Sequence, residues 1–266
     1  MNIDLHTHIL PGIDDGSKDM GTSLEMLNIA KGDGTGHIIL TPHFIHGSVN
    51  NNAALVQEKC LKLTDAAAAE GIEVNLYPGS EVFISPEVPE LAKEGVICTL
   101  NNSKYILVEL PMMSIPSYTP EVLYQLALNG YVPVIAHPER YEAIGKNPSI
   151  LYDYIQRGVL CQVNSTSLIG LYGKKIRETA LTLLRHNMIH FVSSDAHTCK
   201  GRAPRLQKAR DLVAATVGED TAQRLFQANG LSVINNTVIQ APEPLKIRKV
   251  SNWLLPSARF FEKIFG

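Results

Sequence analysis

The segment Val132-Pro133-Val134-Ile135-Ala136-His137 is a short, mostly β-branched run that ends in a histidine, and it predicts a buried strand. Before it, Thr119-Pro120-Glu121 predicts a helix start, with an N-cap, an early proline and an acidic first turn, and Gly130 predicts the helix end. After it, Asn147-Pro148 and Gly158 frame a second helix in the same way. A strand between two helices is the unit of a parallel sheet covered by helices.

The same alternation extends over most of the chain. Six further strands are predicted at residues 2–6, 37–41, 72–77, 105–110, 160–163 and 190–193. Four further helices are predicted at residues 21–31, 53–70, 173–187 and 205–217, where apolar residues follow helical spacing. The chain therefore predicts an α/β fold with a parallel sheet.

The residues that end these strands are the strongest indication of function. In chain order they are His6 and His8, His43, Glu81, Glu109, His137, Asn164, and then Asp195 and His197. In a closed parallel barrel the carboxyl ends of all strands converge on one face, whereas in an open sheet only those near the switch point can meet. One site built from seven strands therefore favours a distorted (β/α)7 barrel, similar to a TIM barrel.

Nine of these groups and their neighbours could ligate metal ions. They are His6, His8, Asp15, His43, Glu81, Glu109, His137, Asp195 and His197. Residues two apart in a strand face the same side, so His6 and His8 can present both imidazoles together. One ion rarely takes more than about six donors, so two or three divalent ions are expected. Mixed imidazole and carboxylate ligands suit Mn²⁺, Fe²⁺ or Zn²⁺ and disfavour Ca²⁺. The other four histidines, His37, His46, His186 and His190, are expected to be surface or core residues, with His46 a weaker candidate for substrate contact.

Composition excludes several classes of protein. Of 266 residues, 45% are hydrophobic and 19% are charged, which indicates a folded core, and the net charge of −2 argues against a nucleic-acid partner held by bulk charge. No apolar run approaches the ~18 residues of a membrane span, and the start lacks the features of a signal peptide. A cytoplasmic protein is expected. Its oligomeric state cannot be derived from these features.

These motifs resemble the PHP (polymerase and histidinol phosphatase) superfamily. The segments His8-Ile9-Leu10-Pro11-Gly12-Ile13-Asp14-Asp15-Gly16 and His137-Pro138-Glu139-Arg140-Tyr141 resemble, more narrowly, the manganese-dependent tyrosine-protein phosphatases of capsule and exopolysaccharide loci, the CpsB/CapC family. The resemblance covers about residues 1–240 and implies a distorted (β/α)7 barrel of the PHP type.

The resemblance also implies three metal ions and their ligands. His6, His8, Glu81 and Asp195 would hold one ion, Glu81, Glu109 and His137 a second, and Asp15, His43 and His197 a third. Arg140 and Arg202 match positions that the family uses around phosphate, a role that suits the guanidinium fork. Asp195 and His197 are expected to be catalytic together with these arginines. A hydroxide held between two ions would attack the phosphorus of protein phosphotyrosine, and the substrate would be a membrane-associated tyrosine kinase that controls polysaccharide export.

Other activities remain open at this point. The same metals suit a small-molecule phosphatase of the histidinol-phosphate type, and a PHP module can also be an inactive scaffold. Cys199 and Arg205 have the spacing of thiolate tyrosine phosphatases, but Pro204 lacks an N–H for the phosphate loop. We interpret this match as coincidence. The four cysteines, Cys60, Cys98, Cys161 and Cys199, are too sparse for a disulfide scaffold or a Cys-x-x-Cys zinc site.

Two segments differ from the rest of the chain. Three alternating glycines in residues 31–36 precede a strand rather than follow one, which excludes a dinucleotide loop and predicts a frayed helix end. Residues 241–266 form a basic, amphipathic tail with five Lys/Arg against two acids, separate from a barrel domain of residues 1–240. The tail could dock on the barrel as a final helix, or contact a membrane surface or a membrane-bound kinase.

Overall fold

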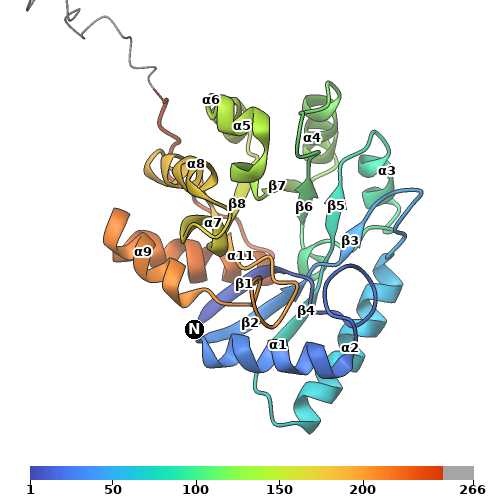
Figure 1. Cartoon of the computed structure of the whole chain (residues 1–266). Helices are drawn as coiled ribbons and strands as arrows, with labels where there is room; N and C mark the ends of the chain where they lie inside the picture. The colour runs from blue at the N-terminus through green and yellow to red at the C-terminus, as the bar shows by residue number, and fades with distance from the viewer. Residues whose placement is uncertain (248–266) are drawn as a thin grey trace, which may run out of the picture.

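Parallel strands form the centre of the molecule in the computed structural model, which describes residues 1–247 (Figure 1). The strands are β1 (Asn2–Thr7), β2 (Thr35–Leu40), β3 (His43–Phe44), β4 (Asn75–Pro78), β5 (Glu81–Phe83), β6 (Tyr105–Glu109), β7 (Val132–Ala136), β8 (Leu160–Asn164) and β9 (Phe191–Ser193). They pair in the order β1-β2-β4 in one sheet and β3-β5-β6-β7-β8-β9 in the other. The predicted α/β fold with parallel sheets is confirmed.

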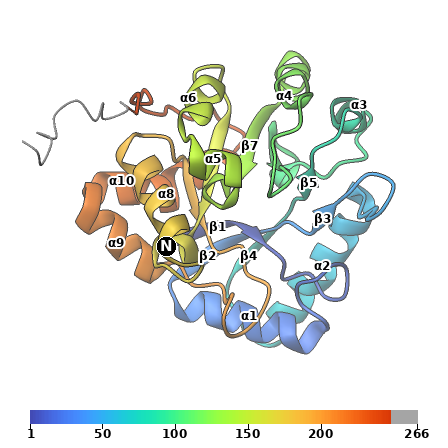
Figure 2. The same cartoon turned by 45° about the horizontal axis from the view of Figure 1, so that its top comes forward.

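Helices surround these strands (Figure 2). They are α1 (Met20–Gly32), α2 (Ala53–Ala69), α3 (Val88–Lys93), α4 (Thr119–Leu128), α5 (Glu142–Lys146), α6 (Ser149–Ile155), α7 (Ser165–Leu168), α8 (Lys174–Arg185), α9 (Gln207–Val217), α10 (Glu219–Gln223) and α11 (Asn229–Ile234), with the short turns η1 (Leu100–Asn102), η2 (Pro138–Arg140) and η3 (Arg224–Ala228). All six predicted helices are present. Helix α4 begins at Thr119 with Tyr118 in the cap position, so the prediction that Thr119 is the N-cap is wrong by one residue.

Strands β3 and β5 are not among the seven predicted strands. Each continues a predicted strand after a break of two residues. The register is the same on both sides of the breaks, since Leu40 pairs with Pro78 and His43 pairs with Glu81. Pro42 has no N–H to offer a neighbouring strand, which accounts for the first break. The breaks leave His43 and Glu81 at the start of new strands, directly opposite each other.

The first and last strands lie side by side at their carboxyl ends. The Asp195 N–H donates to the His6 carbonyl at 2.9 Å, and the His8 N–H donates to the Ala196 carbonyl at 2.8 Å. These two bonds bring residues nearly 190 positions apart in the sequence onto the same face of the molecule.

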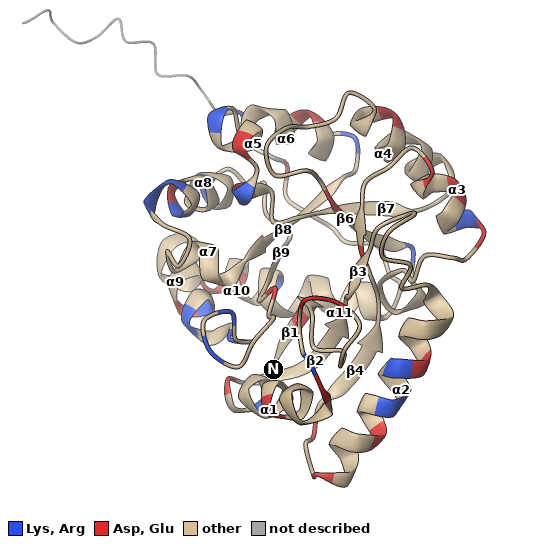
Figure 3. Cartoon of the chain, turned by 45° about the vertical axis from the view of Figure 1, so that its right-hand side comes forward, with Lys and Arg blue, Asp and Glu red and all other residues tan. Residues whose placement is uncertain are grey.

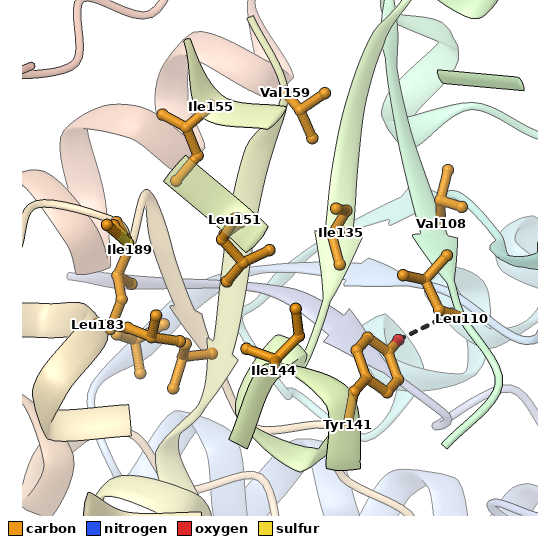
Figure 4. Packing of buried hydrophobic residues seen from close by; sticks show 14 of the residues in the cluster. Val108, Leu110, Ile135, Tyr141, Ile144, Leu151, Ile155, Val159, Leu183 and Ile189 are labelled. Atoms are coloured by element: carbon orange, nitrogen blue, oxygen red, sulfur yellow. Dashed lines mark hydrogen bonds between the residues drawn. The ribbon is translucent and has the colours of Figure 1, made fainter. Parts of the chain in front are cut away.

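The alternation of side chains along the strands separates two regions of the core. Leu107 and Val134 point into a cluster formed by side chains from several strands, whereas Ile106, Val108 and Ile135 pack outward against the helices. Figure 4 shows the outward cluster, including the hydrogen bond between the Tyr141 hydroxyl and the Leu110 backbone. By the same alternation, Glu109 continues the inward-facing row of Leu107.

The glycine-rich segment 31–36 is ordered, so the predicted frayed helix end is wrong. Helix α1 ends at Gly32, and the Asp33 N–H donates to the carbonyls of Ile29 and Ala30. The Asp33 carboxylate accepts hydrogen bonds from the Leu206 and Gln207 N–H groups at the start of α9, at 2.5 and 2.8 Å. A distant helix therefore holds this turn in place.

The described end of the chain packs on the helices around β8 and β9. Leu245 N–H donates to the His186 carbonyl at 2.8 Å, and the Lys246 ammonium lies 5.3 Å from the centre of the Tyr152 ring. Within residues 1–247, no helix is both long and apolar enough to cross a bilayer. On the outer helix α2, basic and acidic residues lie close together (Figure 3). The rest of the predicted tail lies outside the described residues.

Candidate metal centre and phosphate site

All nine predicted ligands lie together at the carboxyl ends of the strands. His6 lies in β1, His43 begins β3, Glu81 begins β5 and Glu109 ends β6. The others lie in the segments that follow strand ends: His8 and Asp15 after β1, His137 after β7, and Asp195 and His197 after β9. A cavity of about 150 Å³ opens among them. The predicted convergence on one face is therefore present in the structure.

The imidazole rings of His6 and His8 approach each other through their Nε2 atoms. Their Nε2 atoms are 3.2 Å apart, and each lies 3.3 Å from the same oxygen of Glu81. The outer nitrogens are held by acceptors: His6 Nδ1 donates to Gln162 Oε1 at 2.9 Å, and His8 Nδ1 donates to Asp14 Oδ2 at 2.7 Å. Because each Nδ1–H is held in this way, loss of the second proton leaves the Nε2 lone pairs directed inward, as in metal-ligating histidines. Only one hydrogen bond can form between the two Nε2 atoms, so only one of them can carry a proton that points at the other. A shared metal cation would instead accept the lone pairs of both nitrogens.

Asp14 and Asp15 have different roles. The Asp14 carboxylate accepts hydrogen bonds from the His8 ring and from the backbone N–H groups of Gly16 and His43. Asp15 is more exposed, and its Oδ1 lies 3.5 Å from His43 Nε2 and 3.3 Å from His197 Nε2. The structure thus places Asp15 among the potential ligands, as predicted, and Asp14 behind His8 as its support. With His8, the three groups Asp15, His43 and His197 offer ligand atoms that all lie within 4.8 Å of one another.

Glu81 lies between the two halves of the site. Its Oε2 is 3.1 Å from His43 Nδ1, and its Oε1 accepts a hydrogen bond from His137 Nε2 at 2.9 Å. Glu109 is 3.7 Å from His43 and 3.8 Å from His137. His43 therefore contacts the Glu81–Glu109 pair as closely as His137, the histidine that the family resemblance places there.

Both predicted phosphate-binding arginines contact Asp195. Arg140 Nη1 lies 3.1 Å from Asp195 Oδ2, and Arg202 Nη2 lies 2.7 Å from Asp195 Oδ1. The Tyr172 ring packs 5.0 Å from the Arg140 guanidinium. Asn164 Nδ2 donates to Asp195 Oδ2 at 2.7 Å, which adds a neutral hydrogen-bond donor to the two arginine contacts. The two arginines and seven of the nine potential metal ligands border the same cavity, whereas His6 and His8 are buried and do not line it.

Two site residues have left-handed backbone conformations. His137 has a φ of 30° and Asp195 a φ of 52°. Such conformations are unfavourable for residues other than glycine and concentrate at functional sites, where the surroundings hold them in place. At Asp195, the bond from its N–H to the His6 carbonyl helps to hold the conformation.

The site attracts positive charge. Burial alone would lower the pKa of His8, but the carboxylates of Asp14 and Glu81 raise it to about 10. Burial and the charge of Glu81 raise the pKa of Glu109 to about 8. Burial and the neighbouring His8 lower the pKa of His197 to about 3. Buried carboxylates that repel one another, with imidazoles between them, are stabilised by cations, which protons or metal ions can supply.

Several supporting contacts were not predicted from the sequence, although Asn164 was named there as a polar residue at a strand end. Gln162 and Asn164 alternate in the buried strand β8, and Gln162 Nε2 donates to Asn164 Oδ1 at 2.9 Å. Polar residues at alternate positions of a buried strand share one face, and this pattern was a usable signal. Asp14 and Met112 carried no comparable signal.

The remaining candidates lie away from the cavity. His37 pairs with Tyr77, His186 Nδ1 donates to the Thr182 carbonyl, and His190 Nδ1 accepts from the Cys161 N–H. His46 is exposed in the loop after β3. Cys199 packs against the core beneath α1 and contacts the Thr22 carbonyl. Burial raises the pKa of the Cys199 thiol, the opposite of what a thiolate nucleophile needs.

Comparison with known proteins agrees with this geometry. The sequence profile of the family described as "Capsular polysaccharide synthesis, CpsB/CapC" matches residues 2–235. The chain is 39% identical to the tyrosine-protein phosphatase YwqE of Bacillus subtilis, covering 93% of this chain and 98% of YwqE. It is 34% identical to the putative tyrosine-protein phosphatase CapC of Staphylococcus aureus, covering 94% of this chain and 98% of CapC.

Solved structures show the same similarity. A crystal structure from work on YwqE of Bacillus subtilis and CpsB of Streptococcus pneumoniae, described as unique metal-dependent tyrosine phosphatases, superimposes with a TM-score of 0.89 at 38% identity, over 93% of this chain and 100% of the other. A histidinol phosphate phosphatase of Lactococcus lactis shares the fold at a TM-score of 0.53 and 14% identity, over 81% of this chain and 94% of the other.

Proposed function

The chain belongs to the CpsB/CapC family of capsular polysaccharide synthesis, and from this premise we propose that it is a metal-dependent phosphatase of protein phosphotyrosine. The observation that carries the proposal is the shared cavity, in which carboxylates and imidazoles suited to cations border two arginines suited to phosphate. The similarity to tyrosine phosphatases over more than nine-tenths of the chain supplies the substrate class.

The ligands fall into three groups in this proposal. His6, His8, Glu81 and Asp195 would hold one cation, Glu81, Glu109 and His137 a second, and Asp15, His43 and His197 a third. Distances of 2.9–3.8 Å between neighbouring ligand atoms support these groups. Mn²⁺ is the proposed metal, with Fe²⁺ and Zn²⁺ as alternatives. The arrangement of strands supports a distorted (β/α)7 barrel of the PHP type, if β2 with β3 and β4 with β5 each count as one interrupted strand.

The residues around the cavity prepare it for phosphoryl transfer. Divalent cations, when bound, activate water for attack on phosphorus and neutralise charge on the phosphoryl oxygens. Arg140 and Arg202 donate hydrogen bonds to the non-bridging oxygens of the substrate phosphate, and Asp195 keeps both guanidiniums beside the cavity before substrate arrives. Asn164 and the backbone of His6 orient Asp195 in turn.

The proposed protein substrate is a membrane-associated tyrosine kinase that controls polysaccharide export. Family membership in capsular polysaccharide synthesis and the tyrosine-phosphatase relatives support this partner. Dephosphorylation of an autophosphorylated, membrane-associated tyrosine kinase, compared with an unrelated phosphotyrosyl protein, measures the preference directly.

The central experiment is hydrolysis of a phosphotyrosyl peptide after chelation and after return of Mn²⁺, Fe²⁺, Zn²⁺ or Mg²⁺. Activity is expected to disappear with chelation and to return with Mn²⁺. Faster turnover of histidinol phosphate than of the peptide would replace the proposal with a small-molecule phosphatase. Inactivity on both substrates with every metal would indicate a PHP scaffold instead.

A further inference from the structure

The site cavity is smaller than a typical pocket for a drug-sized ligand. Its volume is about 150 Å³, against roughly 300–1,000 Å³ for pockets that enclose a drug-sized ligand. The cavity suits the phosphate group, and with the phosphate beside the arginines the attached ring lies toward the mouth. The residues that contact the ring are those on the rim beside the arginines.

Met112 is the apolar residue on this rim. Among residues 1–247, it is the only apolar side chain that lines the cavity, and the other lining residues are acids, histidines and arginines. It is half-buried and lies in the loop between β6 and α4, with its inner side against the main hydrophobic cluster. A polar cavity with one apolar wall suits a ligand that has a charged end and an apolar end.

The backbone holds Met112 close to Arg140. The Met112 carbonyl accepts a hydrogen bond from the Glu142 N–H at 2.9 Å, two residues after Arg140. The Tyr141 hydroxyl accepts a hydrogen bond from the Leu110 N–H at 2.8 Å (Figure 4). These two bonds tie the loop of Met112 to the segment that carries the arginine. These backbone contacts therefore hold the Met112 thioether at a fixed distance from the place where Arg140 would bind the phosphate.

We infer that Met112 is a specificity-determining residue that packs against the aromatic ring of the substrate and favours aryl over alkyl phosphomonoesters. The inference rests on the proposed phosphatase function. The methionine side chain is flexible, and its polarisable thioether makes favourable contacts with the edges of aromatic rings. The next residue, Met113, is 74% exposed and does not line the cavity, so it serves as the matched control.

The test compares Met112→Gln, Met112→Leu and Met113→Gln in the metal-loaded full chain. For Met112→Gln, the KM for a phosphotyrosyl peptide and for p-nitrophenyl phosphate is expected to rise about three- to tenfold. The KM for glycerol phosphate and the inhibition constant of inorganic phosphate are expected to change less than twofold. Met112→Leu, which keeps an apolar side chain of similar volume, and Met113→Gln are expected to resemble the parent chain.

A binding measurement separates this inference from the proposed function. Met112→Gln is expected to reduce the ratio of phenylphosphonate affinity to methylphosphonate affinity in calorimetry, whether or not the chain turns over a substrate. An unchanged ratio, or an equal loss for aryl and alkyl ligands, would overturn the role of Met112. An equal effect of Met113→Gln would do the same. Absence of any hydrolysis by the parent chain would instead contradict the phosphatase proposal.

Discussion

At the scale of single residues, Asp195 is the side chain on which the contacts of the site converge. It accepts hydrogen bonds from Arg140 and Asn164 and forms an ion pair with Arg202. Its Oδ1 lies 3.6 Å from the Nε2 atoms of His6 and His8. Opposing charges lower its pKa despite burial, so it is a carboxylate at every pH of interest. It connects the potential metal ligands with the arginines.

Replacement of Asp195 is therefore expected to affect turnover more than folding. Asp195→Ala should lower kcat for a phosphotyrosyl peptide by at least about 100-fold, because both arginines lose their ion-pair partner and one proposed metal ligand is missing. Cys199→Ser should change kcat less than about twofold, since Cys199 lies outside the cavity. Steady-state kinetics with circular dichroism as a folding control measures both. The reverse result would indicate thiolate chemistry.

Asp14 offers a second residue-scale prediction. Its carboxylate holds the Nδ1 atom of His8, so Asp14→Ala should free the ring and lower the affinity for Mn²⁺ by about 10- to 100-fold. Asp14→Asn keeps an acceptor oxygen and should lose less. Metal content after dialysis against graded Mn²⁺ is the measurement. Equal metal content in parent and Asp14→Ala chains would show that Asp14 does not support His8.

At the scale of elements, the turn after α1 is joined to the start of α9. The Asp33 carboxylate accepts hydrogen bonds from two backbone N–H groups there, which have no partner within the helix. This contact explains why a segment with three glycines is ordered.

Asp33→Ala is expected to lower the free energy of unfolding by about 1 kcal/mol, within the usual range for loss of a helix cap. For a chain of this size, the melting temperature should fall by about 2–4 °C. Asp65→Ala, which removes an exposed carboxylate from α2, is the control and should leave the melting temperature unchanged. Equal melting temperatures for Asp33→Ala and the parent chain would contradict the capping role.

At the scale of the whole molecule, the end of the folded domain can be tested. Residues 241–247 contact the helices through the Leu245–His186 hydrogen bond and the Lys246–Tyr152 pair. We propose that the domain extends to Ile247, seven residues beyond the boundary predicted at 240.

A chain that ends at Ile247 should keep the melting temperature and the peptide turnover of the full chain. A chain that ends at Gln240 loses both contacts and should melt about 2–4 °C lower, which corresponds to about 1 kcal/mol. Thermal unfolding and phosphotyrosyl-peptide assays on the two truncations decide between the boundaries. Vesicle binding by the full chain that is absent in the 1–247 chain would assign membrane contact to the tail.

Much of the architecture could be predicted because strands and helices carry local signals. The structure contains a strand at each of the seven predicted places. At or after the end of each strand, a polar side chain lies in the site. The short strands β3 and β5 were missed, because two- and three-residue strands have no periodicity of their own and depend on the neighbouring strand for their hydrogen bonds. The order of segment 31–36 was missed because its partner, the start of α9, lies about 170 residues away in the sequence.

The sequence alone was enough to predict a metal site, because imidazoles and carboxylates can be identified as ligand types without a structure. Their positions at strand ends also predict that they meet, since the strand ends of a parallel fold lie on one face. Tertiary structure decided the contacts between them. Only folding set the two imidazole nitrogens of His6 and His8 3.2 Å apart, placed Asp14 behind one of them, and put a methionine on the rim. Angstrom distances between side chains depend on the packing of the whole chain, which no local pattern encodes.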